Sequence, residues 1–327
     1  MAVLIVGGAG YIGSHMVAAL IESGTETVVL DNLVKGHRQA VWQGAKFYEG
    51  NMQDAILLDK IFTENDISAV VHFAAYTIVP ESVQDPAMYY DNNVTATLLL
   101  LQGMLKHGVK NIVFSSTAAV YGMPETLPIT EETHEYPINP YGESKLAVER
   151  ILKWYDLAYN LKYVTFRYFN VAGAHESGQI GEDHSPETHL IPIVLQVAKG
   201  KRESLDIFGV DYPTPDGTCI RDYIHVMDLV DAHILGLKRL ESGADSATYN
   251  LGSGNGFSNK EIVEAAKKIT GLDFPVNMKD RRPGDPPVLV ASSEKAKSEL
   301  GWNPTRTNIE DIIQTAWTWH CNKPEGY

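Results

Sequence analysis

The amino-acid sequence predicts an α/β protein with a doubly wound parallel sheet and a second, smaller α/β domain. In the first half of the chain, short runs rich in β-branched residues alternate with longer amphipathic segments, as in βαβ units. A glycine-rich turn joins the first run to the first amphipathic segment. With 327 residues, 44% of them hydrophobic, the chain is long for a single core, which favours two domains.

The first half of the chain supplies the elements of the larger domain. Strands are expected at residues 3–6, 27–30, 69–73, 111–114 and 163–168, and helices at residues 12–23, 54–65, 86–107 and 140–160. Gly24 and Gly108 stand where helices commonly end, because glycine readily adopts the left-handed conformation there. The larger domain is therefore placed at residues 1–170.

The pattern becomes less regular after Asn170. Residues 172–187 combine Gly, His, Ser and acidic residues without periodicity, and residues 211–217 form a turn-rich loop. A strand at residues 223–226 and a helix at residues 228–240 are expected to return to the main sheet. The smaller, substrate-binding domain is placed at residues 171–327, with segment 218–240 rejoining the larger one.

The charge balance restricts the class of partner. The chain has 27 basic and 41 acidic residues and a formal net charge of −14, with no basic run, so we expect it to bind neither nucleic acid nor a membrane. Individual arginines in a cleft can still hold a phosphate. Two distant cysteines and the lack of a basic, apolar leader after Met1 predict free thiols and a soluble protein of the cytoplasm.

The glycine-rich turn predicts a dinucleotide site. Gly7, Gly10 and Gly13 follow a predicted strand and open a predicted helix, which allows a tight turn, close approach of a pyrophosphate and close packing of helix and strand. Asp31 lies at the end of the second strand, where a carboxylate accepts hydrogen bonds from a ribose 2′-OH and repels a 2′-phosphate. The cofactor expected from these residues is NAD, not NADP.

A tyrosine and a lysine are the candidate catalytic residues. Tyr141 and Lys145 are one turn apart on the same face of a predicted helix. We expect the nearby cation, and the positive nicotinamide, to lower the pKa of the Tyr141 phenol so that it can act as a base. The preceding strand ends in Ser115, Ser116 and Thr117, which places hydroxyl groups at the carboxyl edge of the sheet, where ligands bind in this fold class.

Together these motifs resemble the extended short-chain dehydrogenase/reductase family, whose larger domain is a Rossmann-type sheet. Within that family the chain is similar, essentially end to end, to the UDP-galactose/UDP-glucose 4-epimerases. The strings that carry the similarity are GGAGYIGSH at 7–15, YYDNNV at 89–94, FSSTAAVYG at 114–122, RYFN at 167–170 and RDYIHV at 221–226.

The resemblance implies a transient redox cycle that interconverts UDP-glucose and UDP-galactose in galactose metabolism. Tyr141 would remove the proton of the sugar 4-OH while C4 gives a hydride to tightly held NAD, and the 4-keto sugar would turn over and take the hydride back on its other face. The resemblance also implies a homodimer.

The residues implied by the resemblance fall into three sets. Tyr141, Lys145 and Thr117 are the catalytic residues. The cofactor-binding residues are Gly7, Gly10, Tyr11, Ile12, Gly13, Asp31, Asn32, Asn51, Met52, Phe73, Ala74, Ala75, Thr77, Asn92, Ser115, Tyr141, Lys145 and Tyr168. The substrate-binding residues are Thr117, Tyr141, Asn170, His189, Leu190, Phe208, Arg221, Arg282, Asp285 and Leu289.

Four positions depart from the family pattern. Val6 replaces the usual Thr before the glycines, Asn51 stands where an Asp commonly contacts adenine, Thr77 stands where some members have a Lys, and Thr117 replaces the frequent Ser but keeps its hydroxyl. The Thr77 position puts the tightness of NAD binding in doubt.

Other enzymes and other roles remain as alternatives. A nucleotide-sugar 4,6-dehydratase usually carries Asp-Glu directly after the strand-end Thr, where this chain has Ala118 and Ala119. A catalytically silent NAD-binding scaffold would be expected to lack Tyr141 or Lys145. An epimerase acting on N-acetylhexosamines is the remaining alternative, because Leu289 is smaller than the Tyr that is associated with the rejection of these sugars. In the opposing interpretation Leu289 is ordinary core packing and does not affect the choice of substrate.

Two further groups receive structural interpretations. His175, His184 and His189 lie near Glu176, Glu182 and Asp183, but their spacing fits no compact ligand motif, and no metal is expected. Trp302, Trp317 and Trp319 are interpreted as packing groups rather than as a binding platform.

Overall fold

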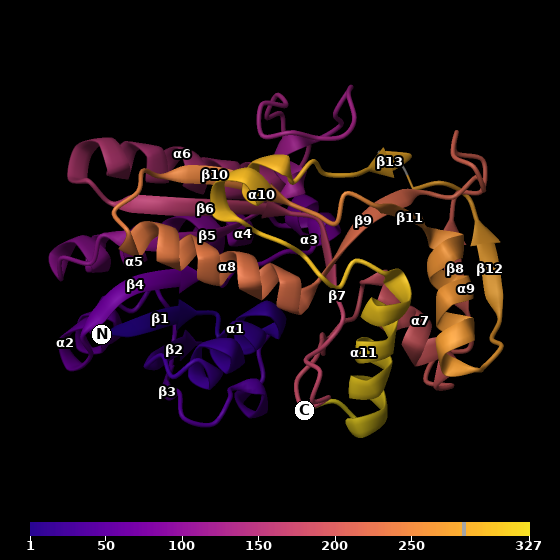
Figure 1. The fold of residues 1–327 in the computed structure, drawn as a ribbon, viewed down its shortest axis with the longest axis horizontal. Coiled ribbons are helices and arrows are strands. Elements are labelled where there is room, and N and C mark those ends of the chain that lie inside the picture. Colours follow the sequence, from indigo (N-terminus) through magenta and orange to yellow (C-terminus); the bar gives the residue numbers. More distant parts are fainter. Residues whose placement is uncertain (283–285) are drawn as a thin grey trace.

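The computed structural model describes residues 1–282 and 286–327, and its main layer is a parallel sheet of seven strands (Figure 1). The strand order is β10-β6-β5-β4-β1-β2-β3. The strands are β1 (Ala2–Val6), β2 (Thr27–Asp31), β3 (Lys46–Glu49), β4 (Ile67–His72), β5 (Asn111–Thr117), β6 (Lys162–Tyr168) and β10 (Ala247–Leu251). The doubly wound sheet and all five strands expected in the first half are confirmed. Strands β3 and β10 were not expected, because neither is a β-branched run.

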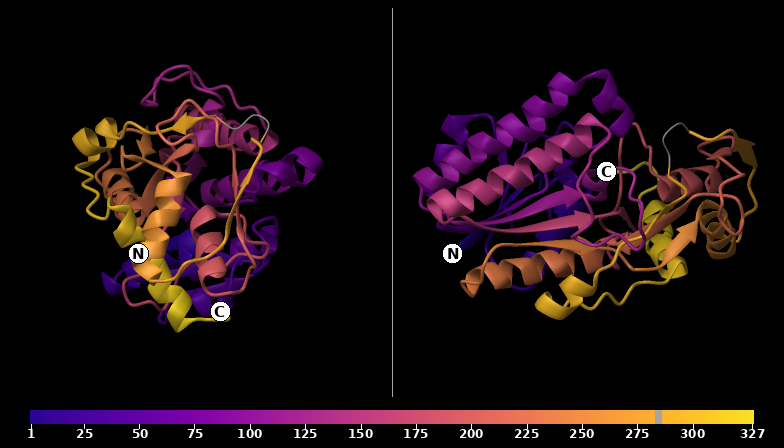
Figure 2. Two further views of the ribbon diagram at one scale, coloured as in Figure 1. Left: turned by 90° about the vertical axis from the view of Figure 1, so that its right-hand side faces the viewer. Right: turned by 90° about the horizontal axis from the view of Figure 1, so that it is seen from above.

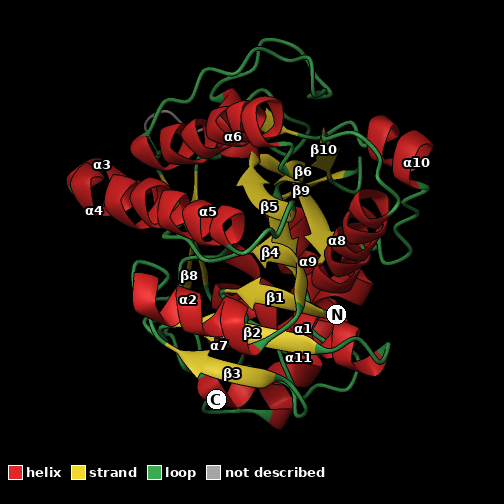
Figure 3. Ribbon diagram, turned by 90° about the vertical axis from the view of Figure 1, so that its left-hand side faces the viewer, coloured by secondary structure: helices red, strands yellow, loops and turns green. Residues whose placement is uncertain are grey.

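Helices cover both faces of this sheet (Figure 3). One face carries α1 (Tyr11–Glu22), α8 (Val226–Glu241) and α10 (Glu294–Leu300). The other face carries α2 (Ala55–Glu64), α5 (Ala96–Lys106) and α6 (Pro140–Tyr159). The helix expected at residues 86–107 is divided into α4 (Pro86–Tyr90), a π-helical turn η2 (Asp91–Thr95) and α5, and it is preceded by α3 (Val79–Gln84). Two short 3₁₀ turns, η1 (Arg38–Ala40) and η3 (Ala118–Tyr121), lie in the loops.

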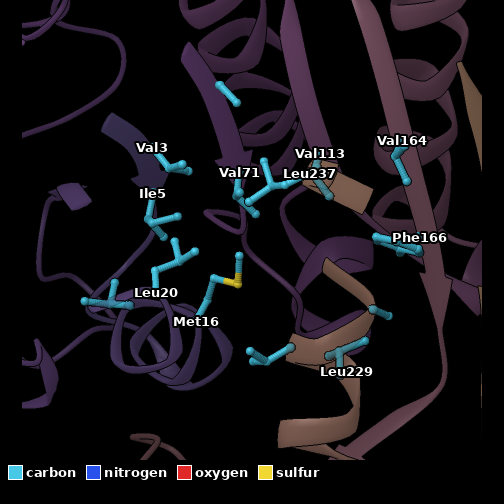
Figure 4. Close-up of a cluster of buried hydrophobic side chains, with 14 of the residues drawn as sticks. Val3, Ile5, Met16, Leu20, Val71, Val113, Val164, Phe166, Leu229 and Leu237 are labelled. Carbon is cyan, nitrogen blue, oxygen red and sulfur yellow. The ribbon is translucent and has the colours of Figure 1, made fainter. Parts of the chain in front are cut away.

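Each face of the sheet has its own apolar core. Between the sheet and helices α1 and α8, Met16 and Leu229 meet Phe166 and Val71 of the strands (Figure 4). Trp302 also lies in this core and donates its indole N–H to the Asp228 carbonyl at 2.8 Å. Because strands covered on both faces must be apolar at every position, the sequence shows continuous hydrophobic runs there.

The second unit is built from short strands and three helices, seen at the other end of the molecule (Figure 2). Its strands are β7 (Asn170–Ala172), β8 (Leu205–Phe208), β9 (Ile220–His225), β11 (Gly256–Ser258), β12 (Val276–Lys279) and β13 (Val288–Leu289). Its helices are α7 (Leu190–Ala198), α9 (Asn259–Thr270) and α11 (Ile309–Asn322), which pack on one another around a third core. Trp317 packs against that core and Trp319 is buried beside it, so the interpretation of all three tryptophans as packing groups is confirmed.

The expected return of segment 218–240 to the main sheet is correct for its helix and wrong for its strand. Helix α8 packs against β5 and β6. Strand β9 instead pairs with β7, β11 and β13 in the smaller sheet. The strand that completes the main sheet is β10, which follows α8 and pairs in parallel with β6. Parallel neighbours in one sheet are joined by a crossover connection that usually contains a helix, and α8 is the helix that precedes β10 and packs against the sheet.

Two absences concern the described part of the chain. None of its helices combines the length and the apolar character that a membrane crossing requires. Neither cysteine of this part forms a disulfide, as expected; Cys219 is buried and Cys321 is exposed.

Candidate active site

Two adjoining cavities open at the carboxyl edge of the main sheet. The first lies between β1 and β4, where the strand order reverses, which is the ligand position in doubly wound sheets. The second lies against α7 and the smaller strands β8 and β9. Their volumes, about 320 and 430 Å³, fall in the usual range of roughly 300–1,000 Å³ for ligand pockets. Asn170 and His189 line both cavities, so the two form one continuous site.

The glycine turn forms one wall of the first cavity. A Cβ atom at Gly7, whose φ is 86°, would lie 2.6 Å from the Ala74 nitrogen, and one at Gly13 would lie 2.1 Å from the Gly7 oxygen. Gly10 precedes α1 and offers no side-chain cap to its first N–H groups. The turn therefore leaves donors at a helix N-terminus, where a pyrophosphate binds favourably.

Asp31 lies at the end of β2 on the same wall. Its two carboxylate oxygens accept hydrogen bonds from the N–H groups of Ala9 and Leu33, both at 2.9 Å. Burial raises the pKa of Asp31, and these two backbone donors oppose that shift. The carboxylate is thus held in one orientation beside the cavity, as recognition of a ribose requires.

Thr117, Tyr141 and Lys145 meet at the end of β5. Asn139 caps α6 by accepting a hydrogen bond from the Gly142 N–H at 2.9 Å, which fixes the first turn that carries Tyr141. The Thr117 hydroxyl is hydrogen-bonded to Tyr141. Lys145 donates to the Ser115 carbonyl at 2.8 Å, and its ammonium lies 5.0 Å from the centre of the Phe114 ring.

The expected effect of Lys145 on the pKa of Tyr141 is not found. Burial raises the pKa of Tyr141, and the hydrogen bond from Thr117 is the influence that opposes it. Burial also lowers the pKa of Lys145 to about 7, although the Glu149 carboxylate acts in the other direction. Because both groups are desolvated in the same pocket and Lys145 is directed at a carbonyl, the protein alone does not generate a phenolate at neutral pH.

The first cavity gathers almost all of the residues expected to bind the cofactor. It is lined by Gly7, Gly10, Tyr11, Ile12, Gly13, Asp31, Asn32, Asn51, Met52, Phe73, Ala74, Ala75, Thr77, Asn92, Tyr141, Lys145 and Tyr168, with Thr117. Ser115 is the exception, since its hydroxyl lies 3.3 Å from His233 behind the strand. Its carbonyl still orients Lys145, so Ser115 supports the site without lining it.

The second cavity gathers most of the residues expected to bind the substrate. It is lined by Asn170, His189, Leu190, Phe208, Arg221 and Arg282, and the Arg282 guanidinium lies 4.1 Å from the centre of the Phe208 ring. Leu289 lines neither cavity. It packs against the apolar cluster of Val120, Tyr121, Ile129 and Leu146, as does Phe169 of the first cavity. Asp285 lies outside the described residues.

Some residues of the site have no clear signal in the sequence. Asn93, in the π-helical turn, donates to the Tyr76 carbonyl and to the Ser144 hydroxyl, both at 3.0 Å, and so ties the cavity wall to α6. Ser116, beside the expected Thr117, also lines the cavity. The motif at residues 89–94 marked this segment as part of the family resemblance. It did not indicate the hydrogen bonds of Asn93, because a π-helical turn depends on tertiary contacts.

Three of the histidines and acids considered in the sequence lie close together in the structure, in a group that the spacing did not indicate and that includes Glu187 but not His175, Glu176 or Asp183. Glu182, His184, Glu187 and His189 offer donor atoms that all lie within 4.8 Å of one another. Irregular backbone between residues 182 and 189 folds back on itself before α7, so the spacing in the sequence does not reveal this proximity.

Comparison with known proteins gives a family and close relatives. The model of the NAD-dependent epimerase/dehydratase family matches residues 3–252. A UDP-glucose 4-epimerase of Streptococcus mutans serotype c is 58% identical, over 100% of this chain and 99% of the relative.

Solved structures agree with these findings. A crystal structure of a UDP-glucose 4-epimerase has a TM-score of 0.99 and 56% identity, covering 100% of this chain and 99% of the other. The enzyme from Bifidobacterium longum, crystallised in complex with NAD+ and UDP, has a TM-score of 0.93 and 41% identity, covering 100% of both chains.

The glycine turn predicts a contrast between two alanine substitutions. Gly13→Ala forces a methyl group against the Gly7 carbonyl and should lower the free energy of unfolding by roughly 1–3 kcal/mol. Gly10→Ala has its nearest contact at 3.4 Å and an extended backbone, so it should leave stability nearly unchanged while weakening dinucleotide binding. Urea unfolding of the cofactor-free variants and titration with NADH measure the two effects. Equal losses of stability would contradict this account.

Proposed function

The chain belongs to the NAD-dependent epimerase/dehydratase family, and we propose that it interconverts UDP-glucose and UDP-galactose by transient oxidation at sugar C4. The observation that carries the proposal is the junction of the two cavities. Tyr141 and Thr117 lie in the first, Arg221 and Arg282 line the second, and Asn170 and His189 belong to both. A nucleotide sugar bound across this junction can place its hexose beside Tyr141 while its diphosphate lies near the arginines.

The residues of the first cavity fit NAD. Gly7 and Gly13 leave the space that a pyrophosphate needs, and the N-terminus of α1 supplies backbone donors. The fixed carboxylate of Asp31 can accept a hydrogen bond from the ribose 2′-OH and repels a 2′-phosphate, so NAD is preferred to NADP. When bound, NAD would supply a hydride acceptor beside the hexose, and return of the hydride to the same sugar would leave no net redox change.

Side chains of the protein transfer the proton and position the reacting groups. Tyr141 takes the proton of the sugar 4-OH and gives it back, and the Thr117 hydroxyl steadies both partners through its hydrogen bond to Tyr141. Lys145, held by its hydrogen bond to the Ser115 carbonyl, is fixed in the wall of the same cavity as Tyr141. Because burial raises the pKa of Tyr141, the positive charge of a bound oxidised cofactor would favour its action as a base.

The second cavity has the chemistry expected of a uridine diphosphate site. Arg221 and Arg282 suit a diphosphate, since a guanidinium donates in pairs to its oxygens. Leu190 begins α7, whose N-terminus faces the same cavity and favours an anion.

We also propose that the protein is a cytoplasmic homodimer. Trp154 and Leu157, three residues apart on α6, are 69% and 70% exposed. Large apolar side chains exposed together on one helix face are typical of an interface between subunits.

The reaction itself is the first test. Incubating the purified protein with UDP-galactose should produce UDP-glucose until equilibrium, with no accumulation of NADH in solution, because the hydride returns to the same sugar. Chromatography of the nucleotide sugars and absorbance of NADH provide the two measurements. Stoichiometric release of NADH would identify a dehydrogenase, and loss of water from the sugar would identify a dehydratase.

Removal of the phenolic hydroxyl tests the assigned base. Tyr141→Phe should lower kcat by at least about 100-fold, as is typical for loss of a general acid–base, while UDP affinity changes much less. Tyr159→Phe, at the other end of α6, is the matched control and should keep wild-type kcat. Turnover of Tyr141→Phe near the wild-type rate would refute the role of Tyr141.

Leu289 is proposed to influence acceptance of N-acetylated sugars. It packs on the same apolar cluster as Phe169, which lines the first cavity. A change in the size of residue 289 can therefore shift Phe169 and alter the space beside the sugar. We expect UDP-N-acetylgalactosamine to react measurably but more slowly, since added volume in an apolar pocket discriminates by only about 1–3 kcal/mol. Leu289→Tyr should widen the preference in kcat/KM for the non-acetylated sugar, and Leu272→Tyr, on the surface, should not. An unchanged preference in Leu289→Tyr would remove Leu289 from the specificity site.

A further inference from the structure

The segment between β7 and α7 brings four potential metal ligands together beside the active site. Glu182, His184, Glu187 and His189 each offer one donor atom, and these atoms lie within 4.8 Å of one another. Glu182, His184 and His189 line the first cavity, and His189 also lines the second. The cluster therefore lies at the junction of the two cavities. The reaction described above assigns no role to Glu182, His184 or Glu187.

Several distances between the donor atoms are close to the spacing of ligands around a tetrahedral ion. Zn²⁺ binds histidine nitrogen and carboxylate oxygen at about 2.0–2.2 Å, which gives a spacing of about 3.3 Å between neighbouring ligands. His184 Nδ1 lies 3.3 Å from Glu182 Oε1 and 3.7 Å from Glu187 Oε2. His189 Nδ1 lies 2.9 Å from Glu182 Oε1 and 3.0 Å from Glu187 Oε1. The four groups thus lie close enough together, within 4.8 Å, for small side-chain rotations to bring their donor atoms around one ion.

One ligand atom is buried and lacks a hydrogen bond. His184 Nδ1 is inaccessible to solvent and makes no hydrogen bond of acceptable geometry, although two carboxylates are near. With a neutral imidazole, this buried nitrogen would face the two carboxylates without a hydrogen bond, which well-folded proteins rarely allow. An ion between His184 and the carboxylates would satisfy this nitrogen.

Neighbouring groups hold the ligands in place, as in known metal centres. Glu187 Oε1 accepts hydrogen bonds from the N–H groups of Thr188 and His189 at 2.7 and 2.8 Å, which leaves Oε2 directed toward His184. The Trp319 indole donates to the Glu182 carbonyl at 3.1 Å and fixes the backbone there. Outer contacts of this kind orient ligands and raise metal affinity.

Charge considerations agree with a divalent ion. The side chains of Glu182 and Glu187 are only 6% and 3% exposed, and their ion pairs within the cluster run to the two imidazoles. The buried negative charge therefore demands two positive charges, either two protons on the imidazoles or one divalent cation between neutral imidazoles.

We infer that Glu182, His184, Glu187 and His189 form a binding site for a divalent transition-metal ion of the zinc type. Two neutral imidazoles and two carboxylates form a neutral complex with such an ion, and this donor set suits Zn²⁺ better than Mg²⁺ or Ca²⁺, which prefer oxygen ligands. The ion connects the two ends of segment 182–189 and so anchors His189 and the start of α7 at the junction of the cavities. Its role is structural, because all four positions are taken by protein ligands.

The test uses the full chain, stripped with a chelator and returned to buffer. Titration with Zn²⁺ followed by elemental analysis should show one tightly held ion per chain, and Co²⁺ should give the intense visible absorption of a four-coordinate site. Both ions should raise the melting temperature of the wild type. His184→Gln and Glu187→Gln should each lower affinity at least about 100-fold, beyond the roughly 10–100-fold typical of losing an outer contact. His134→Gln, an exposed histidine outside the segment, should bind as the wild type does.

A second measurement needs no variant and so does not depend on their folding. X-ray absorption at the zinc edge of the loaded wild type should give four nitrogen or oxygen neighbours, including imidazole, at about 2.0–2.2 Å. The inference is overturned if the wild type shows no saturable binding, if sulfur or six neighbours appear around zinc, or if folded His184→Gln binds as tightly as the wild type. None of these measurements uses epimerase activity, so they are independent of the proposed reaction.

Discussion

The close approach of Gly7 to Ala74 is the constraint on which the site depends. These residues follow β1 and β4, the two neighbouring strands between which the strand order of the sheet reverses. Val6 accepts hydrogen bonds from the N–H groups of Phe73 and Ala74 at 2.8 and 3.0 Å, so the two strand ends are joined where the first cavity begins. A side chain at Gly7 would separate them, and the cavity that is proposed to hold NAD would lose its wall.

The connection between the two sheets positions the substrate relative to the cofactor. Only Phe169 separates β6 of the main sheet from β7 of the smaller one, and β9 runs directly into α8. Tyr168 therefore faces the first cavity while Asn170, two residues later, faces both. Because the chain passes between the sheets twice without a linker, β-ladders help to set the relative position of the cavities. Such rigidity favours a reaction in which hydride transfer requires close and constant geometry.

The segment before α7 contributes to this arrangement from the opposite side. It carries the Glu182 cluster and ends at His189, which lies in both cavities. Tyr11 of α1 donates its phenolic hydrogen to the Gly173 carbonyl at 2.6 Å, which ties the start of this segment to the glycine turn. Bound metal at residues 182–189 would fix the other end. The cofactor wall and the substrate wall would then be joined through one irregular but well-supported segment.

Through its resemblance to a known family, the sequence implied most of the residues around both cavities. By itself the sequence determined the fold class, the five strands of the first half and the dinucleotide motif. It did so because buried parallel strands require continuous apolar runs, and because a glycine turn followed by an acidic strand end can be recognised without distant contacts. Tertiary structure alone decided that β9 joins the smaller sheet, that Ser115 supports Lys145 from behind the cavity, and that burial raises the pKa of Tyr141. It also decided that Glu182, His184, Glu187 and His189 meet. Each of these depends on desolvation or on pairing between distant segments, and no local pattern of residues encodes either.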